Sequence, residues 1–177
     1  MPKPRTIAGD LRRLPVSFRP IRREDTAALF QIYASTRQEE LRQTDWDARQ
    51  RETFLVMQFN AQHQYYQEHY PRGSFDLILL DGEPAGRLYV EQRPAEIRIV
   101  DITLLPAHRG RGVGSQILAA LIELSERRSL PLSIHVEMYN PALALYKRLG
   151  FRHIADNGVY YLMERPLPQA TPATAEE

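Results

Sequence analysis

The chain of 177 residues contains no cysteine, which excludes disulfide bonds, thiolate metal sites and a catalytic cysteine nucleophile. It also lacks an excess of charge of either sign, because 23 Lys and Arg residues face 22 Asp and Glu residues. A general nucleic-acid binder normally carries a basic excess, so this balance argues against that class. No apolar run approaches the roughly 20 residues of a membrane-spanning helix, and the N-terminal residues lack the apolar stretch of an export signal. We therefore expect a cytoplasmic protein.

The two ends of the chain differ in composition from its middle. Seven basic residues among the first 23 face only Asp10, a local charge of +6, and residues 1–15 are predicted to form a basic, flexible leader. Residues 166–177 are rich in Pro, Ala and Thr and are predicted to be a disordered tail. The length suits one domain, which we place at residues 16–165.

Between these ends, strand-like and helix-like patterns alternate. The expected strands are 16–21, 75–80, 85–91, 96–105, 132–137, 151–155 and 159–164, and the expected helices are 23–34, 47–69, 113–128 and 141–149. The three strands between residues 75 and 105 are typical of an antiparallel meander, whereas helix 113–128 connects two strands that should be parallel. The fold class is therefore α/β, with a mixed, mostly antiparallel sheet. The long helix is predicted to bury one row, Phe54, Met57, Ala61 and Tyr65.

The most informative segment is Leu104-Leu-Pro-Ala-His-Arg-Gly-Arg-Gly-Val-Gly-Ser115. A proline ends the strand, and three glycines then let backbone amides approach a ligand without a Cβ in the way. The following helix presents unpaired N–H groups and its positive dipole end. The segment therefore predicts an anion site suited to phosphate, with charge added by Arg109 and Arg111. The alternative for such a loop is a tight turn that only needs positive φ.

Two other nucleotide-binding motifs do not match this loop. A P-loop requires a Gly-Lys pair, which the chain does not contain. A dinucleotide fingerprint requires G-x-G-x-x-G, but the third glycine here comes one residue early. The loop also follows a meander, whereas a dinucleotide-binding domain begins with its fingerprint and adds parallel strands after it.

Two segments together resemble a known family. Arg109-x-x-Gly112-x-Gly114 follows a strand ending Asp101-Ile-Thr-Leu-Leu-Pro106, and it resembles the acetyl-CoA signature (Q/R)-x-x-G-x-(G/A) of the GNAT N-acetyltransferase superfamily. Downstream, Asn140-Pro-Ala-Leu-Ala-Leu-Tyr-Lys-Arg-Leu-Gly-Phe151 is similar to the segment of that family in which Asn, Ala and Tyr precede Gly-Phe. The order of the two segments agrees as well, and the resemblance covers roughly residues 16–165.

The resemblance implies a cofactor site. Acetyl-CoA would be the cosubstrate, with its pyrophosphate on the amides of Arg109, Gly110, Arg111, Gly112, Val113 and Gly114. Its pantetheine arm would lie between two parallel strands that splay apart at 102–105 and 134–137. The N–H near Leu104, beside Leu105, would polarise the thioester carbonyl. Asn140 would be both a helix cap and a cofactor contact.

Acetyl transfer to an amine also needs a proton donor and a proton acceptor. The resemblance makes Tyr146 the donor to the leaving thiolate. Asp101 is our preferred base, and Glu137 and His135 on the neighbouring strand stay open as alternatives. The residues expected to shape the acceptor pocket are Asp76, Glu91, Tyr139 and the aromatic segment 64–70.

The sequence thus predicts an N-acetyltransferase that transfers acetyl directly to a primary amine. The alternatives are a transferase of a longer acyl group and a non-catalytic acyl-CoA-binding or regulatory module. A small-molecule or peptide amine is the expected acceptor, with aminoacyl-tRNA and a homodimer left open. No metal site is predicted, because His63 and His69 lie six residues apart and miss the i, i+4 pairing of helical ligands.

Overall fold

The structure, a computed structural model, describes residues 7–11 and 13–169, so the predictions for residues 1–6 and 170–177 lie outside the described residues. Its elements, with 3₁₀ turns written η, are η1 (Ile7–Asp10), β1 (Ser17–Pro20), η2 (Arg23–Asp25), α1 (Thr26–Ser35), α2 (Gln38–Arg42), α3 (Ala48–His69), β2 (Ser74–Leu80), β3 (Glu83–Gln92), β4 (Ile97–Leu104), η3 (Pro106–His108), α4 (Val113–Arg128), β5 (Leu132–Glu137), α5 (Leu143–Arg148), β6 (Arg152–Asn157) and β7 (Tyr160–Arg165).

The strands form one seven-stranded sheet in the order β1-β2-β3-β4-β5-β7-β6. Every neighbouring pair is antiparallel except β4 and β5, which are parallel. The α4 helix connects these two strands, as a parallel pair requires. The predicted α/β class and the mixed, mostly antiparallel sheet are confirmed.

The parallel pair is joined along only part of its length. Pairing runs from Ile97 opposite Leu132 to Ile99 opposite Ile134, and it stops there although both strands continue. At the same point the register of β3 and β4 shifts, since Tyr89 pairs with Asp101 and Val90 with Ile99. The unpaired Val100 makes a β-bulge, which bends a strand and increases its twist. The bulge therefore lies where β4 turns away from β5.

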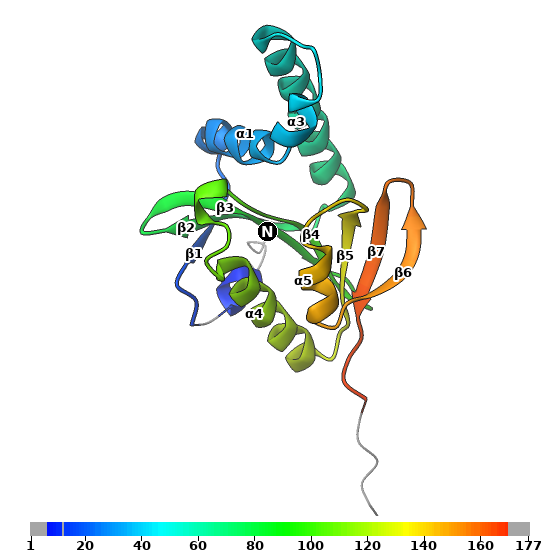
Figure 1. Ribbon diagram of the computed structural model, residues 1–177. Helices are drawn as coiled ribbons and strands as arrows, with labels where there is room; N and C mark the ends of the chain where they lie inside the picture. The colour runs from blue at the N-terminus through cyan, green and yellow to red at the C-terminus, as the bar shows by residue number, and fades with distance from the viewer. Residues whose placement is uncertain (1–6, 12, 170–177) are drawn as a thin grey trace, which may run out of the picture.

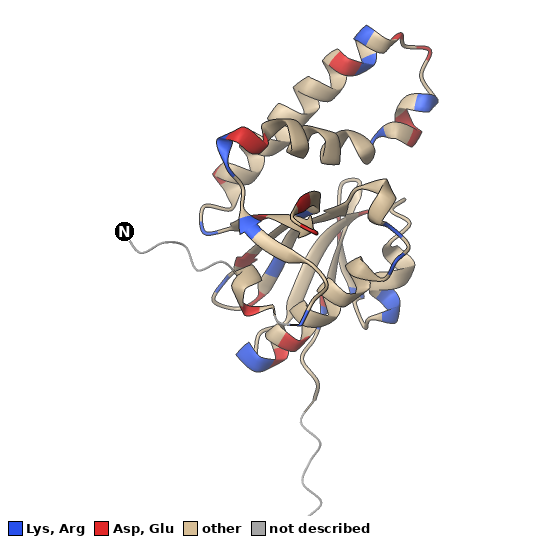
Figure 2. Ribbon diagram, turned by 90° about the vertical axis from the view of Figure 1, so that its left-hand side faces the viewer, with Lys and Arg blue, Asp and Glu red and all other residues tan. Residues whose placement is uncertain are grey.

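Helices cover the sheet on both faces (Figure 1), with α1 and α3 on one side and α4 and α5 on the other. The core on the α4 side contains Ile99, Ile117, Leu121 and Ile134, all with at most 3% of their surface exposed. A smaller core under α1 and α3 contains Leu29, Ile32, Tyr33, Phe59 and Leu77. Basic and acidic residues are interspersed along the ribbon (Figure 2), in keeping with the balanced composition.

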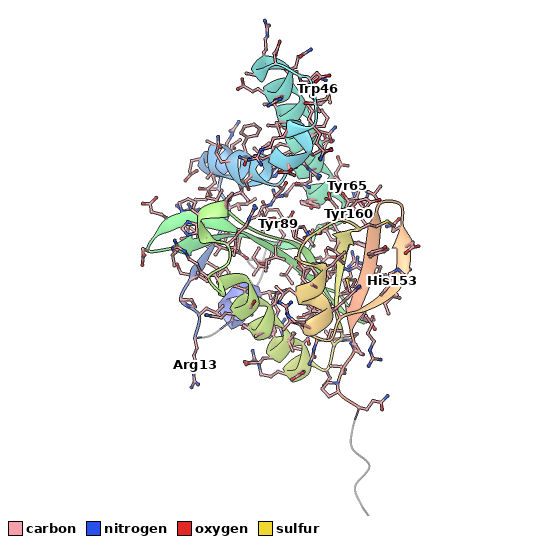
Figure 3. The ribbon with its side chains drawn as sticks, viewed as in Figure 1. Arg13, Trp46, Tyr65, Tyr89, His153 and Tyr160 are labelled. Carbon is pink, nitrogen blue, oxygen red and sulfur yellow. The ribbon has the colours of Figure 1, made fainter. Side chains whose placement is uncertain are left out.

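The predicted buried row of α3 is wrong. Met57 is 58% exposed and Tyr65 is 50% exposed. The row that faces the sheet is shifted by one residue and contains Leu55, buried Phe59 and Gln62. The apolar count favoured the wrong row because the correct one includes a polar residue, which bonds to an arginine of the sheet. The start of α3 extends away from the sheet, and Trp46 lies at its far end (Figure 3).

The predicted flexible leader is also wrong in part. Residues Ile7–Asp10 form a 3₁₀ turn, and the side chains of Ile7 and Ala8 are 6% exposed within the core beside β2 and β3. Asp10 forms an ion pair with Arg128 at the end of α4. Charge counting hid this contact because the two apolar residues are surrounded by basic ones. The sequence reasoning also missed the short α2 helix.

Candidate active site

The diverging ends of β4 and β5 enclose a cleft of about 130 Å³. Side chains from both helical layers and from the sheet reach it, among them Arg37, Gln62, Tyr66, Arg87, Asp101, Thr103, His135, Glu137, Asn140, Tyr146 and Tyr160. The predicted residues Asp101, Asn140 and Tyr146 therefore meet in one place. The glycine loop does not line this cleft and follows the end of β4.

The glycine loop has the backbone geometry of an anion site. Gly110 and Gly112 have φ angles of 71° and 80°, a region that disfavours side chains with a Cβ. Gly112 is the N-cap of α4, and the first helical bond runs from Gln116 N to Gly112 O at 3.0 Å. The N–H groups of Val113, Gly114 and Ser115 therefore have no partner within the helix. They point out of its positive end, where an anion is stabilised.

The side chain of Arg109 contacts the protein itself. Its Nε donates to the carbonyl of Leu104 at 2.8 Å, and its Nη2 donates to Ser35 Oγ at 3.2 Å. The Arg109 N–H also donates to the carbonyl of Pro106 at 3.2 Å. The Arg109 side chain thus holds the loop against the end of β4. Arg111 is exposed, so its side chain is available to bind a phosphate.

The backbone groups of β4 point alternately to β3 and away from it. Leu105 N donates to Ala85 O on the β3 side at 2.8 Å, and its side chain packs under the α1–α3 layer. Leu105 therefore has no free amide for a cofactor, and any contact that it makes with one would be through other atoms. By the same alternation, the N–H of Leu104 faces the side from which β5 has diverged. That amide is free to bind an extended ligand or a carbonyl oxygen.

Tyr146 lies on α5, is 4% exposed, and lines the cleft. Its ring packs edge-on against Phe151, with centroids 5.6 Å apart. Burial, and secondly the charge of Asp101, raises the pKa of the Tyr146 hydroxyl. The hydroxyl therefore keeps its proton at neutral pH and is able to donate it. The turn before α5 is held by Asn140, whose Oδ1 accepts from Ala142 N at 2.8 Å. The helix begins two residues later than predicted, so its N-cap is Ala142 and Asn140 caps only the preceding turn.

Asp101 is the centre of a buried hydrogen-bond network. Its Oδ2 accepts from Arg87 Nη2 at 2.8 Å and from the Tyr66 hydroxyl at 3.0 Å, and its Oδ1 accepts from Thr103 Oγ1 at 2.7 Å. The Arg87 side chain is only 3% exposed, so its ion pair with Asp101 is shielded from water. Burial, and then the nearby Asp101 carboxylate, raises the pKa of Tyr66 and keeps that hydroxyl protonated as a donor.

The sequence reasoning missed Arg87, Gln62 and Arg37, whereas Tyr66 belongs to the aromatic segment 64–70 that was expected to shape the acceptor pocket. Arg87 offered a signal, because a charged residue within the apolar strand 85–91 normally needs a buried partner. Gln62 and Arg37 gave none, since each lies in a helical or turn segment that contacts the strands only through tertiary packing. Arg37 follows α1 and pairs with Glu137 at 2.9 Å, across the open end of the cleft.

Two further findings concern what the described chain lacks. Residues 7–11 and 13–169 contain no group of three or more His, Cys, Asp or Glu side chains placed to hold a metal ion. In the same part of the chain, no helix combines the length and the apolar surface needed to cross a membrane.

Comparison with known proteins places this geometry among acetyltransferases. Residues 26–151 match the family described as the acetyltransferase (GNAT) family. A mycothiol acetyltransferase of Clavibacter michiganensis is 39% identical over 87 residues, which cover 45% of this chain and 28% of that protein. The matches span less than a third of the curated relatives' lengths.

Two solved structures share the fold. The PaiA N-acetyltransferase from Thermoplasma acidophilum, solved with coenzyme A, has a TM-score of 0.64 at 13% identity and covers 85% of this chain and 98% of its own. The ribosomal-protein-S18-alanine N-acetyltransferase from Escherichia coli has a TM-score of 0.56 at 20% identity and covers 89% of this chain and 97% of its own.

Proposed function

Because the chain belongs to the acetyltransferase (GNAT) family, we propose that it transfers acetyl from acetyl-CoA directly to a primary amine. The observation that supports this most is the combination of a parallel strand pair open beyond Ile99 and Ile134 with a glycine loop at the start of the next helix. The absence of cysteine excludes an acyl-cysteine relay. We place the protein in the cytoplasm, and a homodimer is compatible with this function.

Acetyl-CoA would fit this frame in two places. The N–H groups of Gly110 to Ser115, with Arg111, would bind the pyrophosphate. The unpaired edge of β4, with Ile102 and Leu104, would hold the pantetheine arm as an added strand. A Cβ built on Gly112 would project into the open side of the loop, where it meets only Gln116 Nε2, at 3.7 Å. A glycine leaves that space free for the pyrophosphate.

The proposed transfer uses residues of this chain at three points. Leu104 N–H donates to the thioester carbonyl oxygen, where negative charge develops as the amine attacks. The Tyr146 hydroxyl gives its proton to the leaving thiolate. The incoming amine must be neutral, although a free alkylamine titrates near ~10, so a proton acceptor is needed as well.

Asp101 is our proposed proton acceptor, and the atom that would take the proton is Oδ1. Its Oδ2 is held by Arg87 and Tyr66, whereas its Oδ1 accepts only from the Thr103 hydroxyl. Since a hydroxyl rotates at little cost, Oδ1 becomes free when Thr103 turns to another acceptor. The amine proton is then able to pass to Oδ1 directly or through a water molecule.

A turnover assay tests the proposal. The purified protein is incubated with acetyl-CoA and with amines that include small molecules, peptides and aminoacyl-tRNA, and free CoA thiol and the mass of the product are measured. We expect CoA release that depends on an amine and a product heavier by one acetyl group. Tight acetyl-CoA binding without release on any amine would favour the binding-module alternative. Faster turnover with a longer acyl-CoA would favour the other alternative.

A further inference from the structure

Three polar side chains that line the cleft have their acceptor atoms engaged by donors of the protein. The first is Gln62 on α3, whose Oε1 accepts from Arg87 Nη2 at 2.7 Å. A guanidinium group only donates hydrogen bonds, so this contact fixes the orientation of the amide. The atom left for a bound molecule is Gln62 Nε2, which is a donor.

His135 on β5 is oriented in the same way. Its Nδ1 lies 3.3 Å from Arg98 Nη1, and Arg98 is itself held by Glu96 and Ser133. Because Arg98 cannot accept, Nδ1 must be the acceptor and the proton of the neutral ring is on Nε2. Burial, followed by the charge of Arg98, lowers the pKa of His135, which favours the neutral ring. His135 therefore presents a donor at Nε2.

Asn140 follows this pattern on the α5 side of the cleft. Its Oδ1 accepts from the backbone N–H of Ala142, which also only donates, so its Nδ2 group is the free one. The three side chains come from different elements and all line the cleft, and in each the polar atom without a partner among the described residues is an N–H donor. Amide and neutral imidazole side chains each have a donor and an acceptor atom. Three free donors and no free acceptor among them indicate that the ligand supplies hydrogen-bond acceptors.

The carboxylates of the cleft are neutralised within the protein. Asp101 pairs with Arg87, and Glu137 pairs with Arg37. Two cations therefore balance two anions, and the polar atoms of Gln62, His135 and Asn140 that have no partner among the described residues are all donors. A ligand group that offers several oxygen acceptors satisfies these donors, whereas a polycationic chain offers them nothing.

We propose that the acceptor amine carries an oxyacid group, a carboxylate or a phosphate, which the N–H groups of Gln62, His135 and Asn140 bind while the amine faces Asp101 and Glu137. This inference rests on the proposed acetyl transfer and narrows it to amines with an anionic oxygen group near the nitrogen. Polyamines are poor acceptors under this proposal.

Matched pairs of amines test the inference. β-Alanine is compared with β-alaninamide, and phosphoethanolamine with ethanolamine, with spermidine as the polycation and CoA release as the readout. We expect kcat/KM to be about tenfold or more higher for the anionic member of at least one pair, the strength of hydrogen bonds to a charged group. The pair that responds tells carboxylate from phosphate. Equal values within both pairs, or a preference for spermidine, would overturn the inference but leave the acetyl transfer standing.

An isosteric variant tests the residues. Gln62→Glu keeps the bond from Arg87 and replaces the free donor with an anionic acceptor. We expect it to remove the preference for the anionic amine, about tenfold or more. Gln31→Glu makes the same change at an exposed position of α1 that does not line the cleft, and it should keep the wild-type ratio. An unchanged ratio in Gln62→Glu would contradict the assignment.

A binding measurement separates the two proposals. If no amine releases CoA, the proposed function fails, and the inference is then judged by calorimetry with CoA present. Phosphoethanolamine or β-alanine should bind the wild-type protein about tenfold or more tighter than its neutral partner, and Gln62→Glu should lose that difference. Equal binding of the partners, or no binding of any, would refute the inference.

Discussion

The two sides of the proposed active site are built from different parts of the polypeptide. The proposed cofactor side follows the end of β4 and consists of backbone N–H groups in one continuous segment, from Leu104 to the start of α4. The proposed acceptor side is the cleft itself and consists of side chains from separate elements, namely Gln62, Tyr66, Arg87, Asp101 and His135. A backbone site depends on local conformation, whereas a side-chain site depends on how distant elements pack. Substitutions on the proposed cofactor side should therefore change acetyl-CoA binding, whereas those on the proposed acceptor side should change stability as well as activity.

The largest expected effect is on the cofactor side. Gly112→Val places a β-branched residue at a φ of 80° and a Cβ on the open side of the loop. We expect no measurable acetyl-CoA binding by calorimetry, because the amides lose both their orientation and their access.

A matched glycine controls for strain alone. Gly82, in the turn between β2 and β3, has a φ of 81° and nothing within 4 Å of its Cβ position. Gly82→Val should lose a similar amount of stability, about 1–2 kcal/mol, and still bind acetyl-CoA. If both variants bind equally well, the loop is not the cofactor site.

This difference also explains what the sequence could predict. The proposed cofactor side was predicted from glycine spacing, a proline and a helix start, all within twelve residues, and local periodicity predicted the seven strands, the meander and the parallel pair. The places of β1, β6 and β7 in the sheet were not predicted, because they depend on long-range pairing. The acceptor side was predicted only in part: the aromatic segment that contains Tyr66 was expected there, but Gln62 was not, because it reaches the cleft only through the packing of α3. The apolar pattern even favoured the opposite row of that helix. Asp101 was predicted as a base, but nothing local to it indicated that Arg87 and Tyr66 would bind it.

Tyr146 lies between the two sides and gives the next largest effect. Tyr146→Phe keeps the ring packed on Phe151 and removes only the hydroxyl. We expect kcat to fall by roughly a hundredfold to ten-thousandfold, the range for general acid catalysis, with little change in acetyl-CoA affinity. Steady-state kinetics with calorimetry measures both, and Tyr161→Phe, on β7 and outside the cleft, should be neutral. Unchanged kcat would remove Tyr146 from the chemistry.

The acceptor side should respond through stability as well as activity. Asp101→Asn leaves the 3% exposed Arg87 side chain without its counter-ion, and breaking a buried pair costs about 3–5 kcal/mol. Urea unfolding measures this loss, and Asp45→Asn, at an exposed position, should show none. If Asp101→Asn lost activity but kept its free energy of unfolding, the carboxylate would act as a base and contribute little to the stability of the fold.

The smallest expected effect is at Asp76, a carboxyl that belongs to neither side. Its pH dependence shows whether a change of activity with pH arises in the cleft or from the stability of the fold. Asp76 on β2 is 1% exposed, accepts a hydrogen bond from Ser74, and has no partner at Oδ1 among the described residues. Burial raises the pKa of Asp76, and the Ser74 bond only partly opposes it.

An unfolded aspartate titrates near ~3.9, so the folded protein holds the Asp76 proton more tightly than the unfolded chain does. The stabilisation from the neutral carboxyl is complete below that value and is lost as pH rises through the folded pKa. Asp76→Asn stays neutral at every pH and still accepts from Ser74. We expect its free energy of unfolding to fall less with rising pH than that of the wild type, and its Tm at neutral pH to be higher. Parallel pH curves for the two proteins would show that Asp76 titrates alike in both states, and any loss of activity over that range would then belong to the cleft.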